Sequence, residues 1–270
     1  MYIPVEQPEY ALTSVGLDSV TLASRPGLAV TALAGRDSIA AAALAVRERG
    51  ITTLLPVSVA TGTEYGDERE LAHAAERLAA LLHDEAEVLP HIRIGSPRMW
   101  AALNGRFSTV VRERFHVSSP CLACHLYVHL ARVPLAKLLG DVPVVTGERE
   151  SHGCRVKLSQ TALGIDAEIR VLSRAGIELL APIRRIRDGE EIGAIVGDSW
   201  AQGAKQLGCV HSGNYATLDG TVTYDELAYA RYLHGFFEPA GVAIVEAWRE
   251  TAEPNYEAVV RTVLAGPDAA

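Results

Sequence analysis

Apolar residues in the first half of the chain follow two alternating patterns. Short runs rich in apolar residues cover residues 28–33, 52–59 and 88–94. Between them, the segments 39–49 and 67–83 carry apolar residues every three or four positions. A continuous apolar run predicts a strand buried on both faces, and the spacing near 3.6 residues predicts an amphipathic helix. Their alternation predicts an α/β fold with a doubly wound, mostly parallel sheet.

The second half of the chain extends this pattern. We expect further helices and strands over residues 97–103, 120–139, 142–145, 159–175, 177–183 and 190–195. From residue 225 the pattern is helical, with a predicted break at Pro239-Ala240-Gly241. The predicted organisation is an N-terminal arm or hairpin over residues 1–26, an α/β domain over residues 27–200 and a C-terminal helical extension over residues 201–270.

Composition and charge narrow the class of protein. The chain has 270 residues, 49% of them apolar, and a formal net charge of −8. Proteins dedicated to nucleic acids usually have a basic excess, so a small-molecule or protein-borne substrate is expected rather than tRNA. The sequence contains no run of 18 uninterrupted apolar residues and no basic and apolar leader. We therefore expect a cytoplasmic protein without a membrane span, in which the four cysteines serve ligation or catalysis rather than disulfides.

Aromatic residues gather at helical spacing near the C-terminus. They are Tyr224, Tyr229, Tyr232, Phe236, Phe237 and Trp248. Core packing or the contact of a homodimer explains such a face more simply than a substrate pocket does.

The most informative stretch lies between the first predicted strand and the helix that follows it. It reads Ala34-Gly35-Arg36-Asp37-Ser38. A turn of this kind directs backbone N–H groups and the positive end of the helix dipole at one point, where a phosphate can bind. Asp37 and Ser38 would either cap the helix or contact a nucleotide and its metal ion. The alternative is an ordinary capped turn.

Two other predicted strands end at the same edge of the sheet, where open α/β sheets bind their ligands. Ser58 offers a small hydroxyl that could line an adenine or ribose pocket, or it is a plain loop residue. Gly147 permits a close approach of the backbone. Arg149 offers a guanidinium to a phosphate, or it forms a surface ion pair with Glu148 or Glu150.

The pair Cys121 and Cys124 falls at the predicted start of a helix. This spacing places two thiolates within reach of one metal ion, and a helix N-terminus lowers their pKa. Cys209 and Cys154 are rival third ligands, and Cys154 is also a candidate catalytic thiol. An iron–sulfur cluster, a zinc ion, a redox-active dithiol and unligated structural cysteines all remain open.

Histidines near these cysteines extend the possible ligand set. His125 and His129 lie one helical turn apart, which favours a metal site slightly, although a histidine on a helix is more often structural. His152 and His211 lie close in sequence to the other two cysteines, and either could be an acid–base group or a fourth ligand.

Taken in order, these segments resemble the PP-loop ATP pyrophosphatases, which have the HUP-type (adenine nucleotide alpha-hydrolase-like) α/β fold. Their PP-loop pattern is SGGxDS. Residues 33–38 match its last Gly, its Asp and its Ser, and have Leu33 and Ala34 at the first two positions. The segment 145–151 is similar to a loop of phosphoadenylyl-sulfate-reductase-like members. The cysteine pair, the long helix after it and a strand ending in Thr-Gly are similar to Fe–S-dependent tRNA thiolation enzymes. The resemblance covers roughly residues 27–210.

The resemblance implies an enzyme that uses ATP and Mg²⁺ to adenylate a carbonyl-type oxygen and release pyrophosphate. A nucleophile, often a sulfur species, then displaces AMP. The nucleotide-binding residues that it implies are Ala34, Gly35, Arg36, Asp37, Ser38, Ser58, Gly147 and Arg149. Asp37, Arg149 and Cys154 are the implied catalytic residues.

The resemblance also implies a [4Fe–4S] cluster. The separation of Cys209 from Cys124 is similar to that of the third cluster ligand in the thiolation enzymes, so Cys121, Cys124 and Cys209 would be the ligands. Three thiolates would leave one iron open. The alternatives are a ligase or amide-forming enzyme with a structural Zn²⁺ at the same cysteines, and a non-catalytic nucleotide-binding protein.

Overall fold

The computed structural model describes residues 26–117, 120–150, 152, 156–197, 200, 204–251 and 253–266. The predicted N-terminal arm lies outside these residues except for Pro26, and so does the candidate thiol Cys154. In the described parts of the chain, no helix is both long enough and apolar enough to span a membrane.

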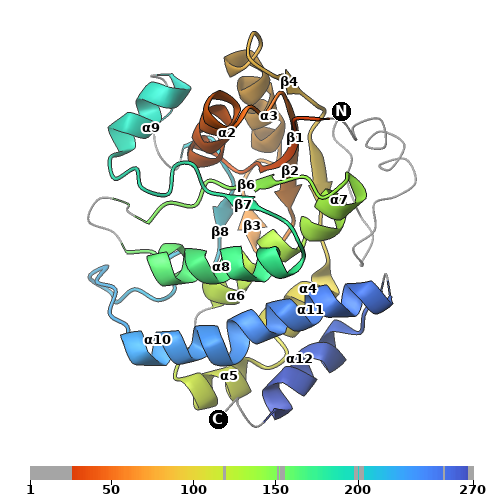
Figure 1. Ribbon diagram of the computed structural model, residues 1–270. Helices are drawn as coiled ribbons and strands as arrows, with labels where there is room; N and C mark the ends of the chain where they lie inside the picture. Colours follow the sequence, from red (N-terminus) through yellow and green to blue (C-terminus); the bar gives the residue numbers. More distant parts are fainter. Residues whose placement is uncertain are drawn as a thin grey trace.

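A parallel sheet forms the centre of the protein (Figure 1). Its order is β4-β2-β1-β6-β7, and β5 also pairs with β2. The strands are β1 (Leu28–Ala32), β2 (Thr53–Val59), β4 (Glu87–Val88), β5 (Ile92–Ile94), β6 (Val144–Val145) and β7 (Leu179–Leu180). All of these pairings are parallel. The structure therefore confirms the predicted α/β fold class with a mostly parallel sheet and C-terminal helices.

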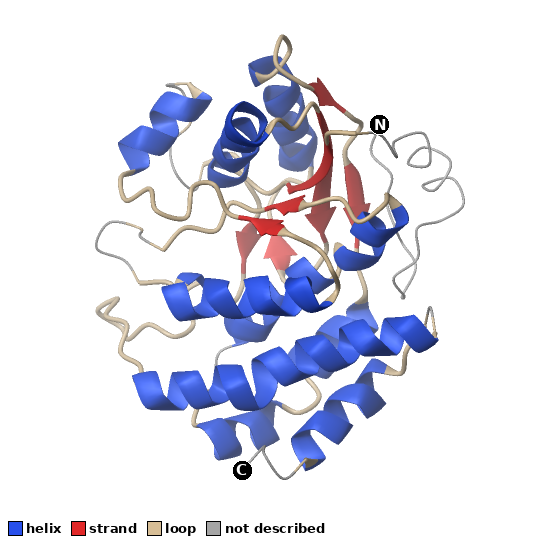
Figure 2. Ribbon diagram, viewed as in Figure 1, coloured by secondary structure: helices blue, strands red, loops and turns tan. Residues whose placement is uncertain are grey.

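The continuous apolar runs arise because both faces of the sheet are covered (Figure 2). On β1, Leu28 and Val30 point into one core, and Ala29 points into the other. The helices α2 (Arg36–Arg49), α3 (Arg69–Leu81) and α9 (Gly189–Val196) pack on one face. The helices α6 (Pro120–Leu130), α7 (Val133–Leu138) and α8 (Ala162–Arg174) pack on the other.

Helix α2 is placed by the central strand and by its own composition. It starts four residues after β1 ends and stops at Gly50, whose φ of 67° is the left-handed conformation that favours glycine. The run Ala40–Ala43 is fully buried, because small side chains allow α2 to fit between α3 and α9 against the sheet. The first turn of α2 therefore lies at the carboxyl end of the central strand.

The C-terminal segment forms a further helical layer beside α6 and α8 (Figure 1). It contains α10 (Glu226–Tyr232), a π-helical turn η3 (Leu233–Phe237), α11 (Glu238–Glu250) and α12 (Tyr256–Ala265), and it packs on α4 (Pro97–Asn104) and α5 (Ser108–Phe115). Tyr229, Tyr232, Phe236 and Phe237 are buried there, so most of the predicted aromatic face is core. The homodimer contact remains a prediction.

Several local expectations were wrong for identifiable reasons. The break predicted at residues 239–241 does not occur: the chain is helical without interruption from α10 through the π-helical turn η3 into α11, and Pro239 closely follows that turn, where the hydrogen bonding already departs from the regular α-helical pattern. The helix expected over residues 120–139 stops at Leu130 and restarts at Val133. The small antiparallel pair of β3 (Glu64–Tyr65) and β8 (Gly208–Cys209) was not predicted, because two-residue strands show no periodicity.

Candidate functional site

A cavity of about 480 Å³ opens at the carboxyl ends of β1, β2 and β6. The first turn of α2, one face of α6, the segment after β6 and the β3–β8 pair line it. The predicted site residues that line it are Ala34, Gly35, Asp37, Ser38, Ser58, Gly147, Cys124 and Cys209. Arg36, Arg149 and Cys121 are not among its described lining residues. The sheet edge thus brings together most, but not all, of the predicted residues.

Ser38 organises the loop at the start of α2. Its Oγ accepts hydrogen bonds from the backbone N–H groups of Ala34 (3.1 Å) and Gly35 (3.2 Å), and its hydroxyl donates to the Gly35 carbonyl oxygen (2.7 Å). The structural role predicted for Ser38 is therefore present, and its contact with a nucleotide remains a prediction. The amides of Arg36, Asp37 and Ser38 belong to the first turn, where an α-helix offers them no acceptor. Together with the helix dipole they form an anion-binding feature.

Gly147 lies directly against this first turn. A Cβ atom built on Gly147 would lie 2.7 Å from the backbone nitrogen of Ser38 and 2.8 Å from its Cα atom. A side chain of any size would therefore push the two backbones apart. The predicted close approach is present, and it holds the segment after β6 against the start of α2.

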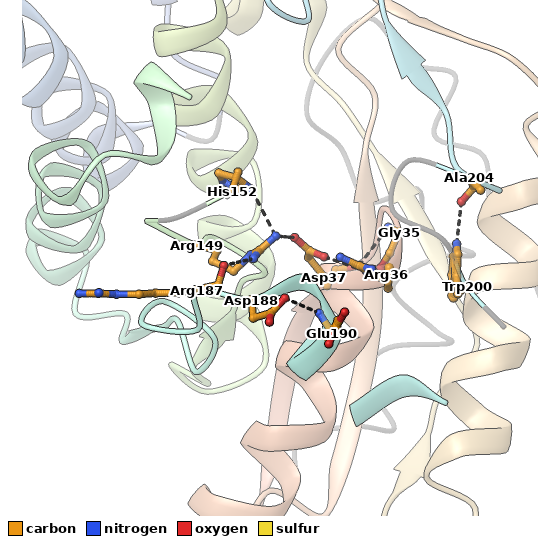
Figure 3. Close-up of polar contacts among 11 residues, drawn as sticks. Gly35, Arg36, Asp37, Arg149, His152, Arg187, Asp188, Glu190, Trp200 and Ala204 are labelled. Carbon is orange, nitrogen blue, oxygen red and sulfur yellow. Dashed lines mark hydrogen bonds and ion pairs between the residues drawn. The ribbon is translucent and has the colours of Figure 1, made fainter. Parts of the chain in front are cut away.

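Asp37 lies between two buried guanidinium groups (Figure 3). Its carboxylate is 3.3 Å from Nε of Arg36 and 3.4 Å from Nη2 of Arg149. Arg149 also donates to the carbonyl oxygen of Arg187 and lies 3.4 Å from Nδ1 of His152. Burial, with Lys157 and Arg149 nearby, lowers the pKa of His152 to about 4, so its ring is neutral at pH 7. Two cations and one carboxylate leave a net positive charge at the start of α2.

Arg149 forms its ion pair with Asp37, and not with Glu148 or Glu150, the partners considered as an alternative. Glu148 and Glu150 do not form its ion pair among the described residues, because each faces another group. Glu150 lies 2.5 Å from Arg184 and 3.0 Å from Arg185, and Glu148 faces α6. Arg149 is only 1% exposed and is bound to Asp37, so a contact between Arg149 and a phosphate remains a prediction.

The described cysteines lie in separate hydrogen-bonding environments. Cys124 Sγ accepts from the indole N–H of Trp100 at 3.3 Å, and Cys121 Sγ donates to the carbonyl oxygen of His211 at 2.9 Å. Cys209 Sγ lies 3.3 Å from the Thr63 hydroxyl, a contact created by the β3–β8 pair. Burial raises the pKa of the Cys124 thiol to about 12. The prediction that the helix N-terminus lowers the pKa of Cys124 is therefore wrong for the unligated thiol. Desolvation raises this pKa by more than the start of the helix lowers it.

The side chains of His125, His129 and Glu148 form a compact polar cluster on the α6 side of the cavity. His125 Nδ1 lies 3.2 Å from Glu148 Oε1, and His129 Nε2 lies 3.6 Å from the same oxygen. His129 Nε2 also lies 3.3 Å from Oε2 of Glu168, a residue of α8. The other oxygen of Glu148 accepts a hydrogen bond from Gln160 Nε2.

Attraction between opposite charges offsets the cost of burying ionised groups in this cluster. Burial alone would lower the pKa of His129, but Glu168 and Glu148 outweigh it and raise that pKa to about 9. Burial opposes the ionisation of Glu148, yet His125 and His129 hold its pKa well below the usual range. Burial raises the pKa of Glu168. The cluster is therefore a site where buried charges depend on one another.

Sequence reasoning found the two histidines but missed their acidic partners. Glu148 was considered only as a surface partner of Arg149, and Glu168 was not considered. The position of Glu168 was nevertheless informative, because it lies three residues after Ile165 and four before Leu172, on the buried face of α8. A glutamate on an apolar face signals a buried partner.

Ser58 has a partner within the protein. Its hydroxyl lies 2.8 Å from Nε2 of His91, and both residues are buried. Burial, together with the charge of Arg93, lowers the pKa of His91 to about 4. Ser58 lines the cavity, so its predicted place in a nucleotide pocket remains open.

No family model matches the chain. The uncharacterized protein MJ0009 of Methanocaldococcus jannaschii is similar to it, with 36% identity over 203 residues. The matched region covers 74% of this chain and 73% of that protein. This identity extends over most of both chains, and the chain therefore belongs to the same family as the uncharacterized protein MJ0009.

Proposed function

We propose that the protein binds ATP and Mg²⁺ at the start of α2, adenylates a substrate and transfers or removes sulfur. The observation that carries the proposal is that one cavity is lined both by the first turn of α2 and by the cysteines Cys124 and Cys209. A nucleotide bound at the helix start would therefore share a space with sulfur ligands.

The charge around the first turn supports the nucleotide part of the proposal. Arg36 and Arg149 flank Asp37, and first-turn amides point towards the same region. Arg36 Nη2 and Arg149 Nε are buried and have no hydrogen-bond acceptor among the described residues. Such a positive region stabilises the negative charge that develops when a substrate oxygen attacks the α-phosphorus and pyrophosphate leaves. Asp37 is the carboxylate that would bind Mg²⁺ in this arrangement.

The donor set of the three cysteines supports an iron–sulfur cluster more than a single zinc ion. The charges of Cys121 and Cys209 both act on Cys124, so the thiols lie within electrostatic range of one another. Their Sγ atoms are not all within 4.8 Å of one another, as judged over the described residues. Thiolates on one zinc ion lie about 3.8 Å apart, given Zn–S bonds of about 2.3 Å. A cluster with three thiolate ligands has one iron that can bind a further ligand, such as a sulfur species.

The nucleotide part can be tested without knowing the substrate. We expect ATP to bind to the full-length protein in calorimetry, with affinity at least about tenfold higher when Mg²⁺ is present. Asp37→Asn should remove this dependence on Mg²⁺, whereas Asp84→Asn, at a carboxylate with 81% of its side chain exposed, should not. The absence of ATP binding, or an unchanged Mg²⁺ dependence in Asp37→Asn, would contradict the proposal.

The sulfur part requires anaerobic purification. The protein should contain iron and sulfide, and Cys209→Ser should lose both, while Cys154→Ser should keep them. Stoichiometric zinc without iron would instead support the ligase or amide-forming alternative. Retention of the cluster in Cys209→Ser would refute the proposed ligand set. Cys154 then becomes the third ligand, and its predicted role as a catalytic thiol is lost.

One observation favours a non-catalytic nucleotide-binding protein as the second candidate. The Ser38 hydroxyl already holds the amides of Ala34 and Gly35, which reduces the number of loop N–H groups that can contact phosphates. ATP binding with no release of pyrophosphate in the presence of any tested acceptor would support this candidate.

A further inference from the structure

The cluster on α6 has a geometry that the proposed adenylation chemistry does not use. One ligand atom each from His125, His129 and Glu148 lie within 4.8 Å of one another, and no other group of three or more His, Cys, Asp or Glu residues among the described residues does so. Two of the three come from successive turns of α6, which presents both imidazoles on one side. The third comes from the segment that follows β6. Both elements are part of the core, so the three side chains are held by rigid supports.

The burial of this cluster leaves polar atoms without hydrogen bonds. His129 and Glu168 are each 1% exposed. Neither ring nitrogen of His129 and neither carboxylate oxygen of Glu168 has a hydrogen-bond partner among the described residues, although the two side chains are within ion-pair distance. Leaving several buried polar atoms unsatisfied is costly, so they indicate a group that the protein side chains alone do not supply.

The donor chemistry identifies that group as a cation. A metal ion takes the place of the proton on each imidazole that it binds, so its charge would face the carboxylates of Glu148 and Glu168. A divalent ion would balance them and accept the nitrogen lone pairs. Two imidazoles and one carboxylate are the ligand set of catalytic zinc sites, and they also suit other first-row divalent ions. Mg²⁺ prefers oxygen ligands and does not match two histidines.

We propose that His125, His129 and Glu148 bind a divalent transition-metal ion of the Zn²⁺ type, at a site separate from the cysteines. Gln160 orients Glu148 through its second oxygen, and Glu168 faces His129 as a positioning residue. This proposal does not depend on ATP binding or on an iron–sulfur cluster.

The position of the site gives the ion an open side towards the cavity. His125, His129 and Glu148 line the same cavity as Gly35 and Asp37. Three protein ligands leave a fourth position for a water molecule or an oxygen of a bound substrate. The ion would therefore act as a Lewis acid on a ligand in the cavity.

Cobalt(II) is the probe that separates this site from the cysteines. Protein depleted with a chelator is titrated with Co²⁺ alone under anaerobic conditions, using the variant Cys121→Ser/Cys209→Ser. We expect one equivalent of Co²⁺ to bind with visible d–d bands and without a thiolate-to-cobalt charge-transfer band. Competition with Zn²⁺ then gives the zinc affinity. A thiolate band, or no metal bound by the folded variant, would overturn the proposal.

Histidine variants in the same background complete the test. His125→Ala, which removes a partly exposed ligand, should weaken Co²⁺ and Zn²⁺ binding by at least about tenfold. The matched control is His73→Ala, at a surface histidine on α3 with 56% of its side chain exposed, which should leave affinity unchanged. Circular dichroism establishes that each variant is folded. If His125→Ala does not fold, Glu148→Gln provides the same test. Unchanged affinity in a folded ligand variant would show that the cluster is an ion-pair network without a metal.

Discussion

The two sides of the cavity use polar groups of different origin. On the α2 wall, which consists of residues 34–38, the polar groups are mostly backbone amides held by one hydroxyl, that of Ser38. On the α6 wall, which consists of His125, His129 and Glu148 with Glu168 buried behind them, the polar groups are side chains from three separate segments. The first wall is local in sequence, and the second spans residues 125–168.

The difference determines how each wall responds to substitution. Backbone amides survive most changes of side chain, so the α2 wall is sensitive mainly to changes in shape. The α6 wall depends on charged side chains that are buried together, and removing one leaves the others without compensation. A single truncation should therefore damage the α6 wall much more than the α2 wall.

The largest expected effect is from Glu168→Ala. The carboxylate lies 3.3 Å from His129 Nε2, and both residues are 1% exposed. Removing one partner of a buried ion pair typically costs about 3–5 kcal/mol. Urea denaturation in the presence of a chelator would measure this loss in the free energy of unfolding without a contribution from bound metal.

Glu178→Ala is the matched control for that truncation. Glu178 pairs with Arg49 at 2.7 Å, but its side chain is 59% exposed. Exposed ion pairs contribute only about 0–1 kcal/mol. Equal losses for the two variants would mean that burial does not distinguish the α6 wall.

The same division between local and non-local features explains what the sequence could predict. The parallel sheet, the turn after β1 and the close approach of Gly147 each follow from a local pattern or from one known rule about sheet edges. The partnership of His129 with Glu168 depends on the packing of α8 beside α6, which no short pattern encodes. The pairing of Arg149 with Asp37 was missed for a similar reason. Glu148 and Glu150 are adjacent to Arg149 in sequence and were the expected partners, whereas Asp37 comes close to Arg149 only in the folded chain.

A smaller effect is expected from pH on the α2 side, where His91 supports Ser58. Burial lowers the pKa of His91 to about 4, against about 6.5 in the unfolded chain. The unfolded state therefore binds the proton first as the pH falls. The stabilisation from neutral His91 is complete above pH 6.5 and is lost as the pH falls towards 4, by about 3 kcal/mol.

His91→Gln is the variant that isolates this contribution. Its free energy of unfolding, measured by denaturant titration at several pH values, should change less than that of the wild type between pH 6.5 and 4. Carboxylates that titrate in the same window contribute equally to both proteins and cancel in the difference. Identical pH profiles would show that His91 is charged in the folded protein, in conflict with its burial.

The smallest effect on stability, but the most specific for the α2 wall, is expected from Gly147→Ala. The new Cβ atom would lie 2.7 Å from the Ser38 nitrogen, so the segment after β6 must move away from the start of α2. Overpacking of this kind typically costs about 1–3 kcal/mol. The matched control is Gly193→Ala in α9, where a Cβ atom meets no atom within 4 Å and alanine should stabilise the helix by about 0.5–1 kcal/mol. The two variants should therefore change the free energy of unfolding, measured by heat or urea, in opposite directions.

Calorimetry with ATP adds a second readout for Gly147→Ala, because displacing Ser38 alters the amides proposed to bind phosphate. A destabilised Gly147→Ala protein that binds ATP as tightly as the wild type would separate the packing at this contact from nucleotide binding, and the α2 wall would then have a structural role only.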